Sequence, residues 1–429
     1  MLGEHKLRNG SVVAIIGGGP SGCSCAIKLK QLAEERGIDL RIILFERKDF
    51  NLHYNQCVGV LSPPIEKVLK EELSISIPKE LIKRKIMGYY ISSGKSEILL
   101  KSKNEEDPTY TVRRVKFDKF ILDEVIKRGV EVIRSRVTDI EFIDRDSKCE
   151  VKVYSESCTI TADMVVGAFG LDEGSLHMFE ESTRNRGRYV RPRMVMHTFI
   201  TKVHPDSSGF INDKLGDIIH AFLLSSLPNI EFGAITPKGD HIIVNIAGEH
   251  VTSVDLENFL KHSAVAKFLP LSQNNIDQME SYKGHFPTSP ARNPYGDRYI
   301  TVGDSTGWLR PFKGKGITTA VMTGISAAKA MINHGISKKG LDAYAAECEY
   351  LTQDYLYGTL VRFCSQLAVK TNYYNFLIEY AKGEERLAKI FYDSVSGHRS
   401  YKDILFEKGN LDLYAKLGIN FMGNIVRRS

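Results

Sequence analysis

The feature that most constrains this sequence is a glycine-rich stretch close to its first residue. The segment VVAIIGGGPSGCSCAIKL, residues 12–29, predicts a buried strand, a bare turn and a helix that begins at Pro20. The glycines Gly17, Gly19 and Gly22 have the G-x-G-x-x-G spacing. In that pattern the first glycine permits the tight turn, the second lets a pyrophosphate approach the main chain, and the third lets the helix pack closely on the strand. Because the helix start also offers N–H groups and the positive end of its dipole, the stretch predicts a dinucleotide-binding unit.

The next predicted strand strengthens this interpretation. The segment LRIILF ends directly before Glu46, which lies 24 residues after Gly22. A carboxylate at that separation can accept hydrogen bonds from the ribose hydroxyls of a dinucleotide. The alternative is an acid that is merely solvated at a strand end. Arg47 beside it can instead contact a 2′-phosphate, so the ribose contact leaves the dinucleotide unidentified.

Composition places the chain among ordinary globular proteins. It has 429 residues, of which 42% are hydrophobic and 26% are charged, enough for two domains with a large core. No apolar run approaches the ~20 residues of a membrane-spanning helix. The polar start MLGEHKLRNG lacks the apolar centre of a signal peptide. We therefore expect a cytoplasmic protein.

Charge, cysteine and histidine usage limit the function classes. The seven cysteines are scattered and form no C-x-x-C pair, which favours a reducing compartment. The twelve histidines form no H-E-x-x-H array, so we predict no metal site. A net charge of +6 is compatible with peripheral contact at an anionic membrane surface or with a phosphorylated ligand. Without clustered basic runs it gives no support for nucleic-acid binding.

The order of predicted elements indicates an interrupted α/β fold. Strands and helices alternate early, antiparallel strands dominate from about residue 188 to 252, and nearly everything beyond 335 is amphipathic helix. We predict a discontinuous Rossmann-type dinucleotide-binding domain, an inserted antiparallel β-sheet substrate domain, and a helical C-terminal region. The predicted ranges are 1–85, 112–185 and 285–335 for the first, 86–111 and 186–284 for the second, and 336–429 for the third.

A second group of residues lies almost three hundred residues after the glycine turn. In YITVGDSTGWLRPFKGKGITTAVM, Gly303 and Asp304 end a buried strand, and Gly314 and Gly316 precede a long helix. An acid at that strand end can accept hydrogen bonds from a polyol, while a glycine-flanked helix start offers N–H groups to an electron-rich ring edge. A flavin requires both. The cations Arg310, Lys313 and Lys315 are expected to place positive potential at that ring edge; the alternative for Lys313 and Lys315 is that they are solvated loop charges.

The same stretch offers a rival from another class of enzyme. Gly303-x-Ser305-x-Gly307 matches the nucleophile elbow of α/β-hydrolases. An elbow must lead directly into a helix, whereas residues 308–315, which include Pro311, intervene here. A hydrolase is therefore the weaker alternative.

Three motifs together resemble the flavoprotein superfamily of p-hydroxybenzoate hydroxylase and, within it, the geranylgeranyl reductase family. They are the glycine turn with Glu46, Arg114-x-x-Phe117-Asp118, and Gly303-Asp304 followed by Pro311 and the paired glycines. The resemblance implies that FAD is the cofactor, that Arg114 contacts it, and that Asp304 binds its ribitol and phosphate region. The cofactor-binding residues that it implies are Gly17, Gly19, Pro20, Ser21, Gly22, Glu46, Arg47, Cys57, Arg114, Val137, Gly303, Asp304, Pro311, Gly314, Gly316 and Ile317.

Weaker marks favour the reductase branch of that superfamily. NQCVGVLSPP resembles the family's Cys-x-Gly-Gly loop near the flavin, with Cys57 and Gly59 kept but Val60 in place of the second glycine. FGAITPKGD resembles an aromatic-x-Trp-x-Phe-Pro stretch, but Ala234 and Thr236 replace its second and third aromatic residues. These departures lie on the substrate side, so they leave the identity of the substrate open.

The resemblance implies an FAD-dependent oxidoreductase that reduces carbon–carbon double bonds of an isoprenoid or similar apolar lipid by hydride transfer from reduced flavin. Cys57 is the candidate catalytic residue, because a thiol with a reference pKa of about 8.5 is protonated at neutral pH and can supply the accompanying proton. The alternative for Cys57 is a small residue that lines the flavin. The sequence carries no second glycine fingerprint for NAD(P)H. The electron donor is therefore open among NAD(P)H, a ferredoxin and another flavoprotein.

An aromatic or apolar-substrate monooxygenase is the main alternative function. Relatives of that type carry an Asp-Gly motif tied to nicotinamide binding, where this chain has Phe169-Gly170. A halogenase is disfavoured because its Trp-x-Trp-x-Ile-Pro motif cannot occur in a chain whose single tryptophan is Trp308. A non-catalytic flavin-binding protein is the remaining alternative. The aromatic residues of the C-terminal helices are expected either to form core or to line a lipid tunnel; they are Phe363, Tyr373, Tyr374, Phe376, Phe391 and Tyr392.

Overall fold

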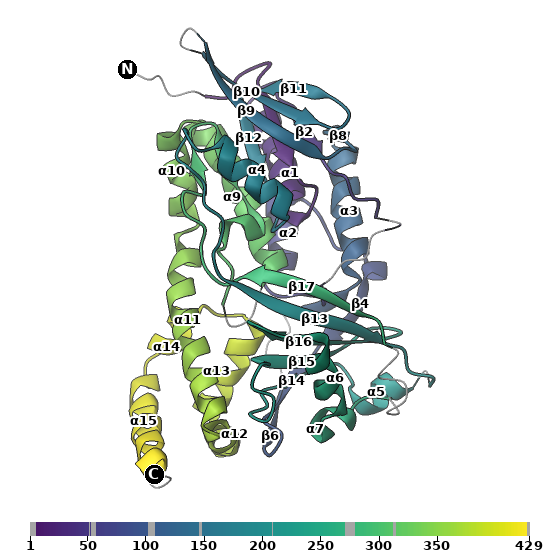
Figure 1. Cartoon of the computed structure of the whole chain (residues 1–429), viewed down its shortest axis with the longest axis vertical. Helices are drawn as coiled ribbons and strands as arrows, with labels where there is room; N and C mark the ends of the chain where they lie inside the picture. The colour runs from purple at the N-terminus through teal and green to yellow at the C-terminus, as the bar shows by residue number, and fades with distance from the viewer. Residues whose placement is uncertain are drawn as a thin grey trace.

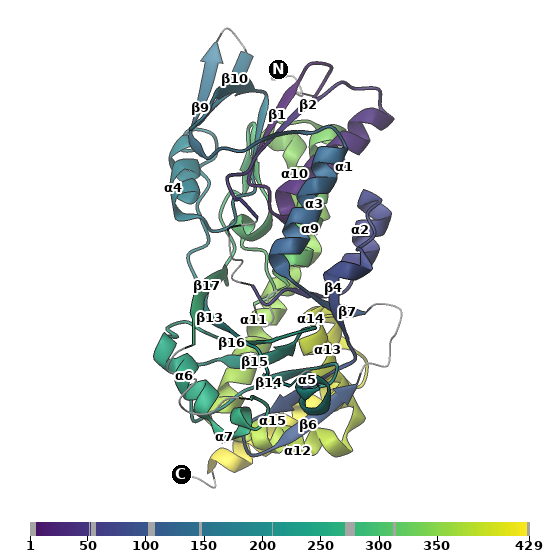
Figure 2. The same cartoon turned by 90° about the vertical axis from the view of Figure 1, so that its right-hand side faces the viewer.

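The computed structural model describes residues 6–50, 52, 57–101, 108–145, 148–207, 209–270, 279–311 and 315–426. The molecule is elongated, with one large sheet toward each end of its long axis (Figures 1 and 2). The six-stranded sheet, called sheet A here, lies near the N-terminus. The seven-stranded sheet, called sheet C, lies near the C-terminus. The helices α10 (Lys338–Glu347) and α11 (Glu349–Lys370) follow one another along one side (Figure 1).

Sheet A has the doubly wound arrangement that the glycine turn predicted. Its first strand pairs in parallel with both of its neighbours, with Ala14 opposite Ile43 on one side and Val165 on the other. The chain therefore changes direction across the sheet at this strand, and in such sheets the crevice at the carboxyl ends is where ligands bind. The strands in spatial order are β18 (Tyr295–Gly296), β19 (Tyr299–Thr301), β12 (Met164–Gly167), β1 (Val12–Ile16), β2 (Arg41–Phe45) and β8 (Glu131–Ile133).

Two helices pack very closely on one face of sheet A. They are α1 (Pro20–Glu35) and α9 (Gly316–His334). A side chain at Gly324 of α9 would collide with the main-chain oxygen of Ser21 in α1, so only glycine permits this approach. The contact joins the first turn of α1 to the middle of α9, which begins eight residues before Gly324. The remaining helices of this half are α2 (Ile65–Leu73), α3 (Arg114–Lys127) and α4 (Glu173–Ser182), with the 3₁₀ turns η1 (Lys79–Leu81) and η2 (Gly303–Thr306).

Sheet C is largely antiparallel and confirms the predicted inserted sheet. A hairpin follows Met87, with Tyr90 opposite Leu99, and the turn after Pro237 joins two neighbouring strands. The strands in spatial order are β17 (Ser281–Pro287), β13 (Val195–Val203), β16 (Ile242–Gly248), β15 (Phe232–Pro237), β14 (Ile218–Phe222), β5 (Gly88–Ser92) and β6 (Glu97–Lys101). The helices α5 (Phe210–Lys214), α6 (Ser253–Lys261) and α7 (Ser263–Ala266) belong to the same region.

Two small sheets complete the described strands. One contains β3 (Val60–Leu61), β7 (Thr109–Val112) and β4 (Ile82–Ile86), and the other contains β11 (Thr159–Ala162), β10 (Lys148–Ser155) and β9 (Val137–Arg145). The first of these lies between the two large sheets, because β3 follows the Cys57 loop and β4 leads into β5. The precise boundaries of the domains stay a prediction.

The C-terminal helices pack mainly against sheet C. Tyr374 and Phe391 stack with ring centroids 5.6 Å apart and join one buried cluster with Ile91 and Leu223 of the sheet. Most of the predicted aromatic residues are thus core, although Phe363 is 62% exposed. After α11 the helices are α12 (Tyr373–Gly383), α13 (Glu385–Ser396), α14 (Tyr401–Phe406) and α15 (Asn410–Val426). Within the described residues, no helix combines the length and apolarity needed to cross a bilayer.

Candidate functional site

The carboxyl edge of sheet A brings the two predicted groups of residues together. Three parallel strands of the sheet end there: β1 runs into the glycine turn, β2 runs into Glu46, and β19, which is separated from β1 by β12, runs into the loop at Gly303. Gly303 packs directly on Ser21, because a Cβ at Gly303 would lie 2.7 Å from the Ser21 hydroxyl oxygen. Segments almost three hundred residues apart therefore form one continuous surface.

Each glycine of the turn has the environment that its predicted role requires. Gly17 has φ +110°, and a side chain there would strike the main chain of Ala168. A side chain at Gly22 would strike the carbonyl of Gly17, so this glycine permits the close helix–strand contact. A side chain at Gly19 would meet nothing within 4 Å. The main chain at Gly19 is therefore bare and open, as the approach of a pyrophosphate requires.

The start of α1 is suited to hold an anion. Pro20 occupies the first turn, Gly19 is the N-cap residue, no side chain caps the helix, and no acidic residue lies in its first turn. The free N–H groups and the positive end of the dipole are consequently available to phosphate.

Glu46 has a second task that the sequence did not indicate. Its carboxylate accepts a hydrogen bond from the main-chain N–H of Gly18 at 2.8 Å and one from that of Lys48 at 2.7 Å. It therefore braces the glycine turn. A carboxylate offers about four acceptor positions, so two remain for ribose hydroxyls. Arg47, by contrast, is exposed.

Asp304 lies close to the starts of α1 and α9, and the charges of Arg114 and His285 act on it. It lies in η2, and a Cβ at Gly316, the first residue of α9, would be 3.6 Å from its Oδ1. Burial raises the pKa of the Asp304 carboxyl, while the charges of Arg114 and His285 act to lower it. Like α1, α9 has no side-chain cap and no acid in its first turn. The Asp304 carboxylate, which can accept hydrogen bonds, and the free N–H groups at the start of α9, which can donate them, thus lie at the same crevice.

Arg114 is held in place by Asp118 and Cys57 and is not a solvated surface charge. Its Nε donates to Asp118 Oδ1 at 2.6 Å, and Asp118 is itself buried. Burial alone would lower the pKa of Arg114, but Asp118 and Cys57 outweigh it and raise that pKa. The guanidinium is therefore fixed beside the sulfur of Cys57.

The Cys57 loop is anchored by a buried lysine from the other half of the molecule. Lys238, at the end of β15, is 1% exposed, and its Nζ donates to the carbonyl oxygens of Val58 at 2.6 Å, Gly59 at 3.1 Å and Val112 at 3.0 Å. Burial lowers the pKa of Lys238 to about 7, and Cys57 acts in the opposite direction. The loop's own geometry is tight as well, since the Gly59 N–H lies 3.4 Å from Cys57 Sγ.

The other predicted site residues lie in or near this edge. Val137 is 4% exposed and belongs to the same cluster as Ile16 and Phe45, the last residues of β1 and β2. Ile317 is buried in the first turn of α9, and Pro311 is buried next to Gly358 of α11. Gly314 and Lys313 lie outside the described residues.

Lys315 and Arg310 both contact other parts of the protein. Lys315 Nζ donates to the carbonyl of Pro63 at 2.7 Å and to that of Gly397. Arg310 is 8% exposed, lies 3.3 Å from an Asp354 oxygen and stacks on the ring of Tyr401. Lys315 is therefore not a solvated loop charge, and both cations connect the loop before α9 to the C-terminal region.

The arrangement around Ser305 contradicts the hydrolase alternative. Ser305 is fully buried, and its hydroxyl lies in hydrogen-bonding reach of the carbonyls of Val302 at 2.9 Å and Gly167 at 3.2 Å. A nucleophile must instead be exposed at the top of its turn beside a base.

Two residues near the site were missed in the sequence. Lys238 was interpreted only as part of a turn, and His285 was not singled out. His285 lies on β17 directly opposite His197 of β13, 88 residues earlier in the chain. Only the pairing of those strands places a histidine near Asp304, so no local pattern could have identified it.

Comparisons with known proteins support the family resemblance. No protein-family model matches the chain. The chain is 24% identical over 314 residues to a digeranylgeranylglycerophospholipid reductase of Methanococcus vannielii, covering 68% of this chain and 74% of that one. It is 23% identical over 361 residues to a geranylgeranyl diphosphate reductase of Synechocystis sp., covering 81% of each.

A solved structure extends the likeness to nearly the full length. A geranylgeranyl bacteriochlorophyll reductase-like protein of Thermoplasma acidophilum superposes with a TM-score of 0.70 at 17% identity, covering 95% of this chain and 99% of that one. The resemblance inferred from the three motifs is thus confirmed, and so is the fold class.

Proposed function

We propose that this protein is an FAD-dependent oxidoreductase that reduces carbon–carbon double bonds of an isoprenoid-like, apolar substrate. The observation that carries the proposal is the convergence at one sheet edge of the open Gly19 turn, Glu46, Asp304 and the uncapped start of α9, directly beside the Cys57 loop. The names of the two curated relatives, both isoprenoid reductases, favour this reaction over other flavin chemistry.

The residues present fit FAD at both of its ends. The N–H groups at the start of α1 would hold the pyrophosphate, and Glu46 would accept hydrogen bonds from the adenosine ribose. Asp304 would accept from the ribitol, and the first turn of α9 would face the pyrimidine edge of the ring. Val137 would complete the binding site beside the ends of β1 and β2, and Arg114 would complete it near Asp304. Because Asp304 is buried, its carboxylate would be stabilised by hydrogen bonds from neutral groups such as the ribitol hydroxyls.

The reaction needs a proton as well as a hydride. When bound, reduced flavin supplies the hydride. An isolated alkene is a poor hydride acceptor, so a positioned acid must protonate the second carbon as transfer occurs. We assign that proton to Cys57 Sγ. Arg114 stabilises the negative charge that the sulfur would carry after giving up its proton, since its guanidinium contacts this atom. His285, near Asp304, is the second candidate for holding the proton.

The neighbourhood of the Cys57 loop suits an apolar substrate. Val60, directly after the loop, packs in a small cluster with Tyr89 of sheet C and Tyr392 of α13. The rings of Tyr89 and Tyr392 lie 5.8 Å apart. This apolar cluster joins the small β3–β7–β4 sheet, sheet C and α13, and it offers apolar surface next to the Cys57 loop for a prenyl chain.

We also propose an electron donor class and a cellular location for this protein. A donor that docks transiently, whether NAD(P)H, a ferredoxin or another flavoprotein, would reduce the flavin. We propose a cytoplasmic protein that meets its lipid at the membrane surface. The mildly basic net charge of +6 is compatible with anionic lipid headgroups.

The proposal is tested by cofactor analysis followed by single turnover. The purified protein should be yellow, and the flavin released on denaturation should have the mass of FAD. After anaerobic chemical reduction, addition of a geranylgeranyl lipid should reoxidise the flavin and add two hydrogens per reduced double bond, as measured by mass spectrometry. A colourless protein that binds no added FAD contradicts the proposal. Oxygen consumption coupled to a hydroxylated product would show the monooxygenase instead.

A further inference from the structure

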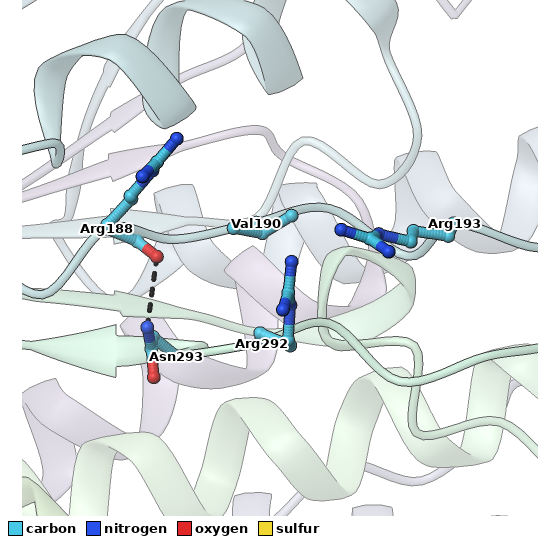
Figure 3. A pocket seen from close by; sticks show the side chains of 5 residues that line it. All are labelled: Arg188, Val190, Arg193, Arg292 and Asn293. Carbon is cyan, nitrogen blue, oxygen red and sulfur yellow. Dashed lines mark hydrogen bonds between the residues drawn. The ribbon is translucent and has the colours of Figure 1, made fainter.

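A cavity lined by arginines lies away from the crevice just described. It has a volume of about 530 Å³ and is lined by Arg188, Val190, Arg193, Arg292 and Asn293. The side chains of Arg193 and Arg292 extend toward the same space on one side of Val190. The side chain of Arg188 lies on the other side of Val190 (Figure 3). Three cations therefore share one cavity.

The cavity is built from the two chain segments that connect sheet A to sheet C. One segment leads from α4 to β13 and the other from β17 to β18. They are joined by a pair of main-chain hydrogen bonds of 2.9 Å between Val190 and Arg292. Asn293 adds a side-chain bond of 3.1 Å to the carbonyl of Arg188. The cavity wall is thus a fixed structure.

The same two segments rest on the loop that holds Asp304. Tyr189, beside Arg188, donates its hydroxyl to the carbonyl of Ser305 at 2.7 Å. Ala291, beside Arg292, donates its main-chain N–H to the carbonyl of Thr306 at 2.9 Å. The arginine cavity is consequently one layer of main chain away from the Asp304 loop.

The arginines of the cavity have no anionic partners among the residues that the structure describes. None of the three guanidinium groups pairs there with a carboxylate, and all three residues are exposed. Nearby carboxylates are engaged elsewhere: Glu180 pairs with Arg191 at 2.8 Å, and Asp297 pairs with Arg186 at 3.5 Å. Three like charges repel one another in a shared cavity, and an anion removes that repulsion. The planar forks of arginine match the oxygens of phosphate in particular.

We propose that Arg188, Arg193 and Arg292 form a binding site for the phosphate group of a small-molecule ligand. The identity of the ligand rests on the proposed function. The binding itself does not, because it involves neither Cys57 nor the FAD crevice. The phosphate can come from a nucleotide electron donor or from the diphosphate head of a prenyl substrate. Arg193 and Arg292 are the main ligands, and Arg188 adds charge at the rim.

The test measures binding of inorganic pyrophosphate to the flavin-loaded protein by calorimetry at fixed, low ionic strength. We expect saturable binding that weakens by about tenfold or more in Arg193→Gln/Arg292→Gln, since two charge-assisted contacts are lost. Arg292→Lys should fall between, because it keeps the charge and loses the fork. Arg184→Gln is the matched control: Arg184 is an exposed arginine of the same segment that already pairs with Glu181. It should bind as the unaltered protein does.

Two further titrations identify the source of the phosphate. Arginine-dependent preference for NADPH over NADH assigns the site to the electron donor, and arginine-dependent binding of geranylgeranyl diphosphate assigns it to the substrate head. Unchanged flavin content and circular dichroism verify that the variants are folded. The proposal is overturned if the unaltered protein fails to bind pyrophosphate, or if the double variant binds it equally well. Because these readouts need no turnover, they remain decisive even if the proposed reductase activity fails.

Discussion

The Nζ atom of Lys238 lies 2.6 Å from the carbonyl oxygen of Val58, although the two residues are 180 positions apart in the chain. Two more carbonyls complete its contacts, so all three ammonium hydrogens are used on the Cys57 loop and the adjacent end of β7. The lysine therefore fixes the loop that carries the proposed proton donor. It also ties the end of β15 to that loop.

Replacing Lys238 should release the Cys57 loop. In Lys238→Met the carbonyls of Val58 and Val112 lose this donor, each at a cost of about 1–3 kcal/mol if no water replaces it, while the Gly59 carbonyl keeps its bond from the Val112 N–H. We expect a lower melting temperature and faster alkylation of Cys57, measured by peptide mass mapping, with the exposed Cys364 as internal reference. Lys85→Met, at an exposed position of β4, should change neither property. An unchanged Cys57 alkylation rate in a destabilised Lys238→Met would show that the lysine is structural only.

Gly19→Val should weaken flavin binding while leaving the fold intact. Gly19 has an ordinary extended conformation, φ −74° and ψ −177°, and a side chain there meets nothing in the protein. The added methyl groups would instead occupy the space proposed for the pyrophosphate. We expect FAD affinity, measured by fluorescence titration, to fall by about tenfold or more, equivalent to at least about 1.4 kcal/mol. Gly383→Ala, also in open space, is the control. Full FAD affinity in Gly19→Val would place the pyrophosphate elsewhere.

Removing the thiol of Cys57 tests its proposed role in proton delivery. Cys57→Ala should slow turnover by about 10²–10⁴, the usual contribution of a general acid. Its flavin content should match that of the unaltered protein, since Asp118 still holds Arg114 when the sulfur is removed. The rate of flavin reoxidation by substrate is the measurement. If the rate is unchanged in Cys57→Ala but falls in His285→Ala, the proton comes from the histidine.

Stability should fall as pH drops below 6.5, partly through His220. Burial lowers the pKa of His220 to about 4, against 6.5 in the unfolded chain. The unfolded state therefore binds the proton more tightly, so the stability present above pH 6.5 is lost as pH falls toward 4. At pH 5 the loss from this one group is about 2 kcal/mol.

His220→Phe isolates that contribution to stability. The ring packs against Phe268 with centroids 4.4 Å apart, so phenylalanine can fill the site without a proton to bind. The drop in melting temperature between pH 7 and pH 5 should be smaller in the variant than in the unaltered protein. Other buried histidines, such as His241, continue to contribute. An equal drop in both proteins would exclude His220 as a source of acid sensitivity.

The sequence by itself determined the local elements and the edge at which they act. The glycine spacing required a strand ending at Ile16 and a helix beginning at Pro20, and the structure has both boundaries. Local steric rules suffice there, because only glycine tolerates the conformation at Gly17 and only a small residue permits the packing at Gly22. The strand that ends before Glu46 followed equally from hydrophobic pattern.

Only the tertiary structure decided which distant residues meet. Lys238 reaches Val58 across 180 positions in the chain, and His285 comes near Asp304 through its pairing with β13. The arginine cavity likewise needs two crossing connections to lie side by side. Local sequence carries no record of such contacts, because they depend on how whole sheets are placed and on which charges become buried when water is excluded.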